Sequence, residues 1–104
     1  MKKVKATISL FDEKLGGRKS PLVPVRFFGC PLFFKNIAEL SSHGYDCRIL
    51  VNEYGKEINP GDTIHDLDIL FLSPDEVFKY IKIGTEFYLW EGGYIGTGII
   101  TRID

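Results

Sequence analysis

Residues 85–103 read TEFYLWEGGYIGTGIITRI, and this stretch decides the fold class of the chain. Two strand-like runs, 85–90 and 94–103, lie on either side of the short connection Glu91-Gly92-Gly93. Adjacent glycines adopt the backbone angles that a tight turn between antiparallel strands requires. We therefore predict a β-hairpin over residues 85–103.

Further strands are predicted upstream of the hairpin. Residues 3–11 alternate, with Val4, Ala6, Ile8 and Leu10 on one face, as in a half-buried strand. Residues 22–35 are apolar and aromatic, but their prolines and Gly29 exclude a helix and favour one or two strands with a bulge or bend. Cys47 to Val51 and Ile64 to Leu72 complete the predicted strands, with turns over residues 12–18, 52–56 and 58–62.

Helical signals are scarce. Residues 37–40 favour a helical turn, but Ser41-Ser42-His43-Gly44 follows too soon for a stable helix, so we predict a loop or short turn. Residues 77–83 alternate only loosely, and their state stays open. Several short strands between glycine and proline corners favour a closed barrel or a sandwich, because a single open sheet would expose its edges. The pattern alone leaves both architectures open.

Length and composition limit the organisation of the chain. Its 104 residues, 44% hydrophobic and 26% charged, fit one domain spanning 1–104 with one core. No apolar stretch follows the basic N-terminal residues, and no run approaches the roughly 18 apolar residues of a membrane span. We expect a cytoplasmic protein without a membrane partner, in which Cys30 and Cys47 are reduced, buried and small hydrophobic residues.

The charges are distributed unevenly along the sequence. Residues 1–35 hold eight basic and two acidic side chains, a net charge of +6, and the remaining residues carry −7. If folding keeps the two signs apart, a basic face is available for phosphate. If antiparallel strands interleave them, no such face forms, and this second alternative is the one that we favour.

Three motifs resemble the C-terminal domain of translation elongation factor Tu, in the same order and over almost the whole chain. Gly16-Gly17-Arg18-Lys19-Ser20-Pro21 is similar to that family's Gly-Gly-Arg-His-Thr-Pro, and an aromatic strand follows in both. Pro60-Gly61-Asp62-Thr63-Ile64 resembles Pro-Gly-Asp-Asn-Val before a hydrophobic strand. Glu91-Gly92-Gly93, with Gly96-Thr97-Gly98-Ile99-Ile100 after it, resembles Arg-Glu-Gly-Gly-Arg-Thr-Val-Gly-Ala-Gly-Val-Val. The resemblance implies a six-stranded antiparallel β-barrel.

The same residues can also serve the fold alone. Gly92 and Gly93 close a hairpin, while Gly96 and Gly98 let strands or an aromatic ring approach closely. Pro60-Gly61-Asp62 forms a turn. The motifs therefore predict the fold better than they predict the function.

In elongation factor Tu this barrel binds, without catalytic residues, to the GTPase domain, the T-stem of aminoacyl-tRNA and the exchange factor. The resemblance implies that Glu91 and Gly92 face tRNA, with Lys35 or Asn36 as weaker positional matches. Tyr94 departs from the family, which has Arg after Glu-Gly-Gly, and the loss of a cation there weakens a phosphate-binding surface. The basic residues that remain as candidates for binding are Arg18, Lys19 and Arg26.

Enzymatic functions find little support. The chain has no Gly-x-x-x-x-Gly-Lys-Ser/Thr motif, so we expect it to bind no GTP. His43 and His65 do not stand at metal-ligand spacing with the cysteines, and we expect no metal and no cofactor. Asp66 and Asp68 favour the solvent face of a strand over paired acid–base carboxylates. A cysteine nucleophile with a histidine base has no local support.

Two classes of function remain, and both are binding functions. The one that we favour is a protein-binding module, related to translation or acting as a decoy or immunity protein against a toxin that docks on the translation factor. The alternative is a module that binds tRNA or other RNA. Exposed aromatic residues would support a protein partner, because tyrosine and tryptophan anchor interfaces, although aromatic residues of barrels are more often packed inside. The candidates are Tyr45, Tyr54, Tyr80, Tyr88, Trp90 and Tyr94.

Overall fold

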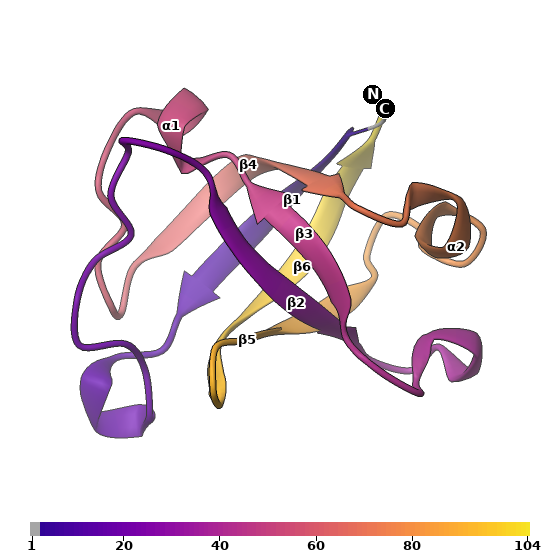
Figure 1. Ribbon diagram of the computed structural model, residues 1–104, viewed down its shortest axis with the longest axis horizontal. Coiled ribbons are helices and arrows are strands. Elements are labelled where there is room, and N and C mark those ends of the chain that lie inside the picture. The colour runs from indigo at the N-terminus through magenta and orange to yellow at the C-terminus, as the bar shows by residue number, and fades with distance from the viewer. Residues whose placement is uncertain (1–2) are drawn as a thin grey trace.

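The computed structural model describes residues 3–104 and consists mainly of six β-strands (Figure 1). The strands are β1 (Lys3–Leu10), β2 (Phe28–Phe34), β3 (Tyr45–Ile49), β4 (Thr63–Phe71), β5 (Glu86–Trp90) and β6 (Tyr94–Ile103). The helices are short: α1 (Val51–Tyr54), α2 (Pro74–Phe78), and 3₁₀ turns at Glu13–Leu15 and Ala38–Leu40.

The strands form a closed antiparallel barrel in the order β1-β4-β3-β2-β5-β6. This resolves the choice between barrel and sandwich in favour of the barrel. Strands β2, β3 and β4 follow one another, and β1 lies beside β4, so these four strands form a Greek key. The connection from β1 to β2, residues 11–27, is the long crossover of the key, and it passes the end of the barrel (Figure 1).

The predicted alternation fills the barrel interior. Val4, Ala6, Ile8 and Leu10 of β1 are all buried, and Leu67, Ile69 and Phe71 of β4 contribute the same inward face. The outward positions of β1 carry the polar side chains Lys3, Lys5, Thr7 and Ser9, as expected for a strand with one face on a core. Strands β1 and β6 pair antiparallel and close the barrel, so the start of β1 lies beside the end of β6. There the Asp104 N–H donates to the Lys3 carbonyl over 3.1 Å.

Glycines of β6 let the barrel close tightly. A Cβ on Gly98 would stand 2.3 Å from Cζ of Phe87, a side chain with no solvent exposure. A Cβ on Gly96 would stand 2.6 Å from the Ser9 carbonyl oxygen of the neighbouring strand. The structural role predicted for these two glycines, close approach of a strand and of a ring, is therefore confirmed.

One prediction of local structure needs correction, and two stretches whose structure was left open are now assigned. Residues 77–83, whose alternation left their state open, begin inside α2, where Pro74 occupies the first turn with Asp75 and Glu76. Proline and acidic residues favour a helix N-terminus. The strand predicted from Cys47 to Val51 corresponds to β3, which ends at Ile49. Helix α1 begins at Val51 and covers much of the turn predicted over residues 52–56. The stretch 22–35 forms one strand, β2, preceded by a single bridge between Leu22 and Ile58.

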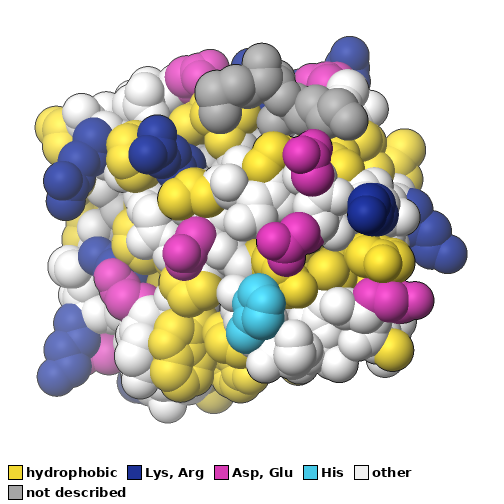
Figure 2. Space-filling model, turned by 45° about the vertical axis from the view of Figure 1, so that its right-hand side comes forward, with side chains coloured by type: hydrophobic (Ala, Val, Ile, Leu, Met, Phe, Trp, Pro, Cys, Tyr) yellow, Lys and Arg dark blue, Asp and Glu magenta, His cyan; other side chains and the backbone are white. Residues whose placement is uncertain are grey.

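Folding pairs three basic residues of the first third, Lys3, Lys5 and Arg18, with acidic side chains. Asp68 of β4 lies between Lys5, whose Nζ is 3.0 Å away, and Lys3 at 3.9 Å. Arg18 is paired with Glu91. On the face shown in Figure 2, acidic and hydrophobic side chains occupy the centre, and lysine and arginine lie mostly toward the edges. This face offers no broad basic surface.

Candidate functional site

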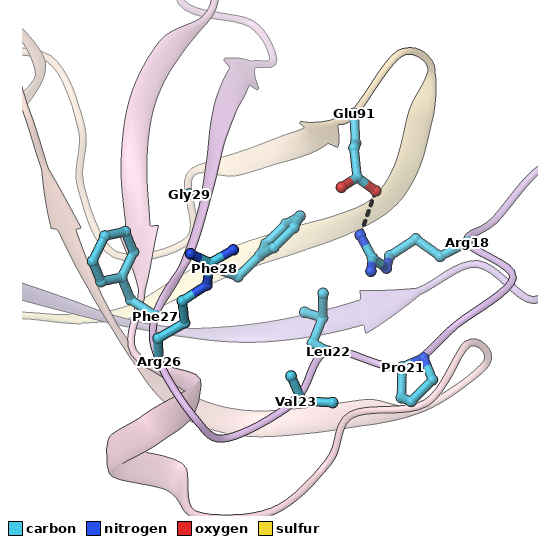
Figure 3. A pocket seen from close by; sticks show the side chains of 9 residues that line it. All are labelled: Arg18, Pro21, Leu22, Val23, Arg26, Phe27, Phe28, Gly29 and Glu91. Atoms are coloured by element: carbon cyan, nitrogen blue, oxygen red, sulfur yellow. Dashed lines mark hydrogen bonds and ion pairs between the residues drawn. The ribbon is translucent and has the colours of Figure 1, made fainter.

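A hollow of about 400 Å³ opens at the end of the barrel, between the crossover, the start of β2 and the β5–β6 hairpin (Figure 3). Three candidate residues from the sequence analysis, Arg18, Arg26 and Glu91, line it. The remaining lining is mostly apolar and consists of Pro21, Leu22, Val23, Phe27, Phe28 and Gly29. We call this feature the hairpin hollow.

Local backbone contacts fix the crossover in place. The Gly17 N–H donates to the Asp12 carbonyl over 2.9 Å, and a Cβ on Gly17 would stand 2.0 Å from the Phe11 carbonyl oxygen, so only glycine fits. Leu22 exchanges two backbone hydrogen bonds with Ile58, of 2.9 and 3.0 Å, and both side chains are buried. These two anchors hold Arg18 between them.

Arg18 is a structural clamp across the hollow. Its Nη1 donates to Oε1 of Glu91 (Figure 3), and its Nε donates to the Ser20 carbonyl over 3.1 Å. The guanidinium also lies 5.2 Å from the centroid of the Phe28 ring, within the range of a cation–π contact. The Arg18 cation is thus already satisfied by protein groups.

Arg26 differs from Arg18 in its pairing. Its side chain is exposed, reaches from the crossover toward Phe28 (Figure 3), and makes no hydrogen bond or ion pair with the described residues 3–104. The neighbouring Phe27 is 39% exposed and carries the Arg48 guanidinium 4.6 Å from its ring centroid. Arg26 therefore supplies a free cation beside exposed aromatic surface.

A second feature lies on the outer face of β2, β5 and β6, and we call it the aromatic cluster. Its members, Phe33, Tyr88, Trp90 and Tyr94, form four ring contacts with centroid separations of 4.7–5.9 Å. Trp90 is 37% exposed and Tyr94 is 46% exposed. Lys35 caps one end, with its Nζ 4.2 Å from the Tyr88 ring centroid.

The other candidate residues lie outside both features. Lys19 is exposed and has no hydrogen bond or ion pair within the described part of the chain. Asn36 is exposed after β2 and has a φ of 59°, which indicates a turn. Gly92 has a φ of 69° in the hairpin, where the Glu91 N–H donates to the Gly93 carbonyl over 2.8 Å.

The aromatic candidates divide between core and surface. Tyr45 is buried against Phe34, and Tyr54 and Tyr80 are exposed on other parts of the surface. Sequence reasoning missed Phe27 and Phe33 as functional candidates. For Phe33 a signal existed, because Leu32 and Phe34 both face the core and alternation then directs the side chain between them outward.

The geometry gives no support to nucleophilic or metal chemistry. Both cysteines are buried and form no disulfide, and the side-chain hydrogen bond with Cys30, together with burial, raises the pKa of the Cys47 thiol well above its usual value. A raised pKa disfavours the thiolate that a nucleophile requires. His43 and His65 contact Gly44 and Thr7, and residues 3–104 hold no cluster of three potential metal ligands.

Searches against protein-family models and against curated proteins found no match to this chain. Among residues 3–104, no helix has the length and apolar character needed to cross a membrane.

Proposed function

We propose that this barrel is a non-catalytic module that binds another protein through the aromatic cluster. The observation that carries the proposal is the partial exposure of Trp90 and Tyr94 on a contiguous set of four packed rings. Tryptophan and tyrosine contribute large contact areas at little cost in side-chain entropy, and they are enriched among residues that dominate binding energy.

The arrangement of the rings favours a protein over RNA as the partner. Three of the four ring contacts are edge-to-face, so the rings pack on one another and do not form a row of parallel faces for bases. Glu86 is exposed on the same strand, two positions from Tyr88, and its charge repels phosphate. Of the basic candidates, Arg18 is neutralised by Glu91 and Arg26 lies in the hairpin hollow. Lys35 borders the aromatic cluster at Tyr88, whereas RNA binding draws most of its affinity from several free cations.

The resemblance to the C-terminal domain of elongation factor Tu supports a cytoplasmic partner of a particular kind. A barrel that presents a surface like that of the translation factor competes with it for a translation component, or for a toxin-like protein that docks on it. In this role the chain acts as a decoy or immunity protein and needs no GTP.

The test is site-specific photocrosslinking in a lysate of the organism that makes the protein. A photoreactive phenylalanine derivative replaces Tyr94 in one tagged sample, and replaces Tyr54, an exposed tyrosine on α1, in a matched control. We expect one protein adduct from the Tyr94 sample that survives nuclease treatment, and none from the control. Adducts equal at both positions, or recovery of RNA that disappears with rising salt, would contradict a protein partner on this face.

A solution measurement follows binding directly. Trp90 is the only tryptophan in the sequence, so its fluorescence and its quenching by acrylamide report on the aromatic cluster. We expect the identified partner to reduce this quenching, because the 37% exposed indole becomes covered. Unchanged quenching at saturating partner would place the interface elsewhere.

A further inference from the structure

Strand β2 has an unpaired edge, and this edge lies against the hairpin hollow. Strand β3 pairs with β2 along Phe28–Leu32, but β5 pairs with it only along Leu32–Phe34. Within the described part of the chain, residues 28–31 therefore pair with a neighbouring strand on one side only. The chemical reason is local: Pro31 has no N–H to donate, and β5 ends at Trp90, where the chain turns into the hairpin.

The register shows which backbone groups of β2 are directed toward that open side. The Lys35 N–H donates to the Glu86 carbonyl across the β2–β5 pair, over 2.9 Å. In an antiparallel strand alternate residues hydrogen-bond to the same side, so Phe33, Pro31 and Gly29 share this direction. Gly29 lies beyond the last pair with β5, and it lines the hollow.

Neither the backbone conformation nor the packing at position 29 requires glycine. Its φ lies outside the left-handed region, and a Cβ there would make only ordinary contacts, at 3.7 Å to Phe27 and 3.8 Å to the Cys47 carbonyl oxygen. Its absence of a side chain leaves the backbone of the edge accessible to another strand. Unpaired strand edges are templates for added strands.

The charges at the hollow select the kind of strand. Arg26 is unpaired among the described residues, and the exposed Arg48 lies over the Phe27 ring. The one lining carboxylate, Glu91, accepts from Arg18. The exposed apolar side chains of the lining are Val23 and Phe27. A carboxylate with apolar neighbours complements this combination.

We propose that the hairpin hollow binds an extended acidic peptide segment of a partner protein. The segment adds as a strand to the free edge of β2 at Gly29, places a carboxylate on the Arg26 guanidinium, and packs apolar side chains on Phe27 and Val23. This mode of recognition combines backbone hydrogen bonds for affinity with side-chain pockets for specificity. It concerns a surface other than the aromatic cluster and does not depend on the function proposed above.

The test begins with a library of random octapeptides displayed on phage and selected on the intact barrel. We expect enriched peptides to share an Asp or Glu flanked by apolar residues. A fluorescent synthetic copy of the best peptide then gives affinities by anisotropy. Arg26→Ala weakens binding about tenfold or more, the loss expected for a hydrogen bond to a charged group, and Arg26→Lys restores part of it.

Two control variants distinguish binding in the hairpin hollow from binding elsewhere on the barrel. Lys19→Ala removes an exposed cation that does not line the hollow, and it leaves the affinity unchanged. Tyr54→Ala, which removes an exposed side chain of α1 outside both features, also leaves it unchanged. The peptide assay reports on the hairpin hollow and the photocrosslinking reports on the aromatic cluster, so failure of either proposal is distinguishable from failure of the other. Two further peptides are N-methylated, one at the odd-numbered amides and one at the even-numbered amides. Only alternate residues pair with β2, so we expect one of these peptides to lose binding and the other to keep it.

Three results would overturn the proposal: enrichment of no peptides or of peptides without acidic residues, wild-type affinity in Arg26→Ala, or equal tolerance of N-methylation at both sets of positions. A ¹⁵N–¹H correlation spectrum of Arg26→Ala verifies that the variant is folded, which we expect because Arg26 is exposed.

Discussion

Arg18 and Glu91 are 73 residues apart in the sequence, and the Arg18 Nη1 donates to Oε1 of Glu91. The pair joins the Greek-key crossover to the β5–β6 hairpin and forms the wall of the hairpin hollow (Figure 3). Both residues stand beside paired glycines in the sequence, Arg18 after Gly16-Gly17 and Glu91 before Gly92-Gly93. In this protein they bind each other, which removes one cation and one anion from the surface available to a partner.

The Arg18–Glu91 pair is expected to contribute modestly to stability. Glu91 is 45% exposed, so water and salt screen the interaction, and exposed pairs contribute about 0.2–1 kcal/mol. A double-mutant cycle with Arg18→Gln and Glu91→Gln, measured by urea unfolding, gives the coupling free energy. A coupling that does not weaken at high salt would contradict an interaction governed by screened charge.

Gly98→Ala is expected to destabilise the barrel strongly. Its new Cβ overlaps the Phe87 ring, which is fully buried, so the ring or the strand must shift. Overpacking of this kind costs about 1–3 kcal/mol. Thermal unfolding measures the loss, and the double variant Gly98→Ala/Phe87→Leu recovers part of it because the smaller side chain vacates the overlap. Gly93→Ala, where nothing lies within 4 Å of a new Cβ, serves as the matched control.

The stability of the protein is expected to fall at alkaline pH through Cys47. The side-chain hydrogen bond with Cys30 and burial raise the pKa of the Cys47 thiol in the folded state, whereas the unfolded thiol titrates at about 8.5. The folded state therefore binds this proton more tightly, and its contribution is complete below about pH 8.5 and is lost as pH rises from there toward the folded pKa.

Denaturant unfolding across this range, for the wild type and for Cys47→Ala, isolates the effect of the thiol. The variant unfolds more easily at neutral pH because a small buried group is missing, but its stability declines less steeply with pH. Identical slopes for the two proteins would contradict the assignment to Cys47.

Asn36 is expected to serve the turn after β2 and not a ligand. Its φ of 59° lies in the left-handed region, which glycine and asparagine tolerate and β-branched residues do not. Asn36→Gly leaves stability near that of the wild type, whereas Asn36→Val costs about 1–2 kcal/mol. Urea unfolding of both variants measures this difference in stability. If Asn36 instead bound a partner, both changes would impair partner binding and the two variants would be equally stable.

Sequence reasoning found most strands and several residues of the site, for reasons that are local. The alternation in Val4, Ala6, Ile8 and Leu10 identifies β1 without reference to any other strand. The glycines at 92 and 93 mark the hairpin in the same way. By contrast, residues 77–83 were uninformative, because α2 ends at Phe78 and buries mainly Val77, too few positions to establish a helical period.

The alternation, the turn glycines and the charge asymmetry were thus determined by the sequence itself, because side-chain direction along a strand and the φ of a turn are properties of neighbouring residues. Only the tertiary structure decided that Arg18 meets Glu91, that Arg26 remains unpaired among the described residues, and that β2 keeps a free edge at Gly29. These relationships depend on strand order and register around a closed barrel, which bring together residues that are far apart in the chain and leave no periodic signal in it.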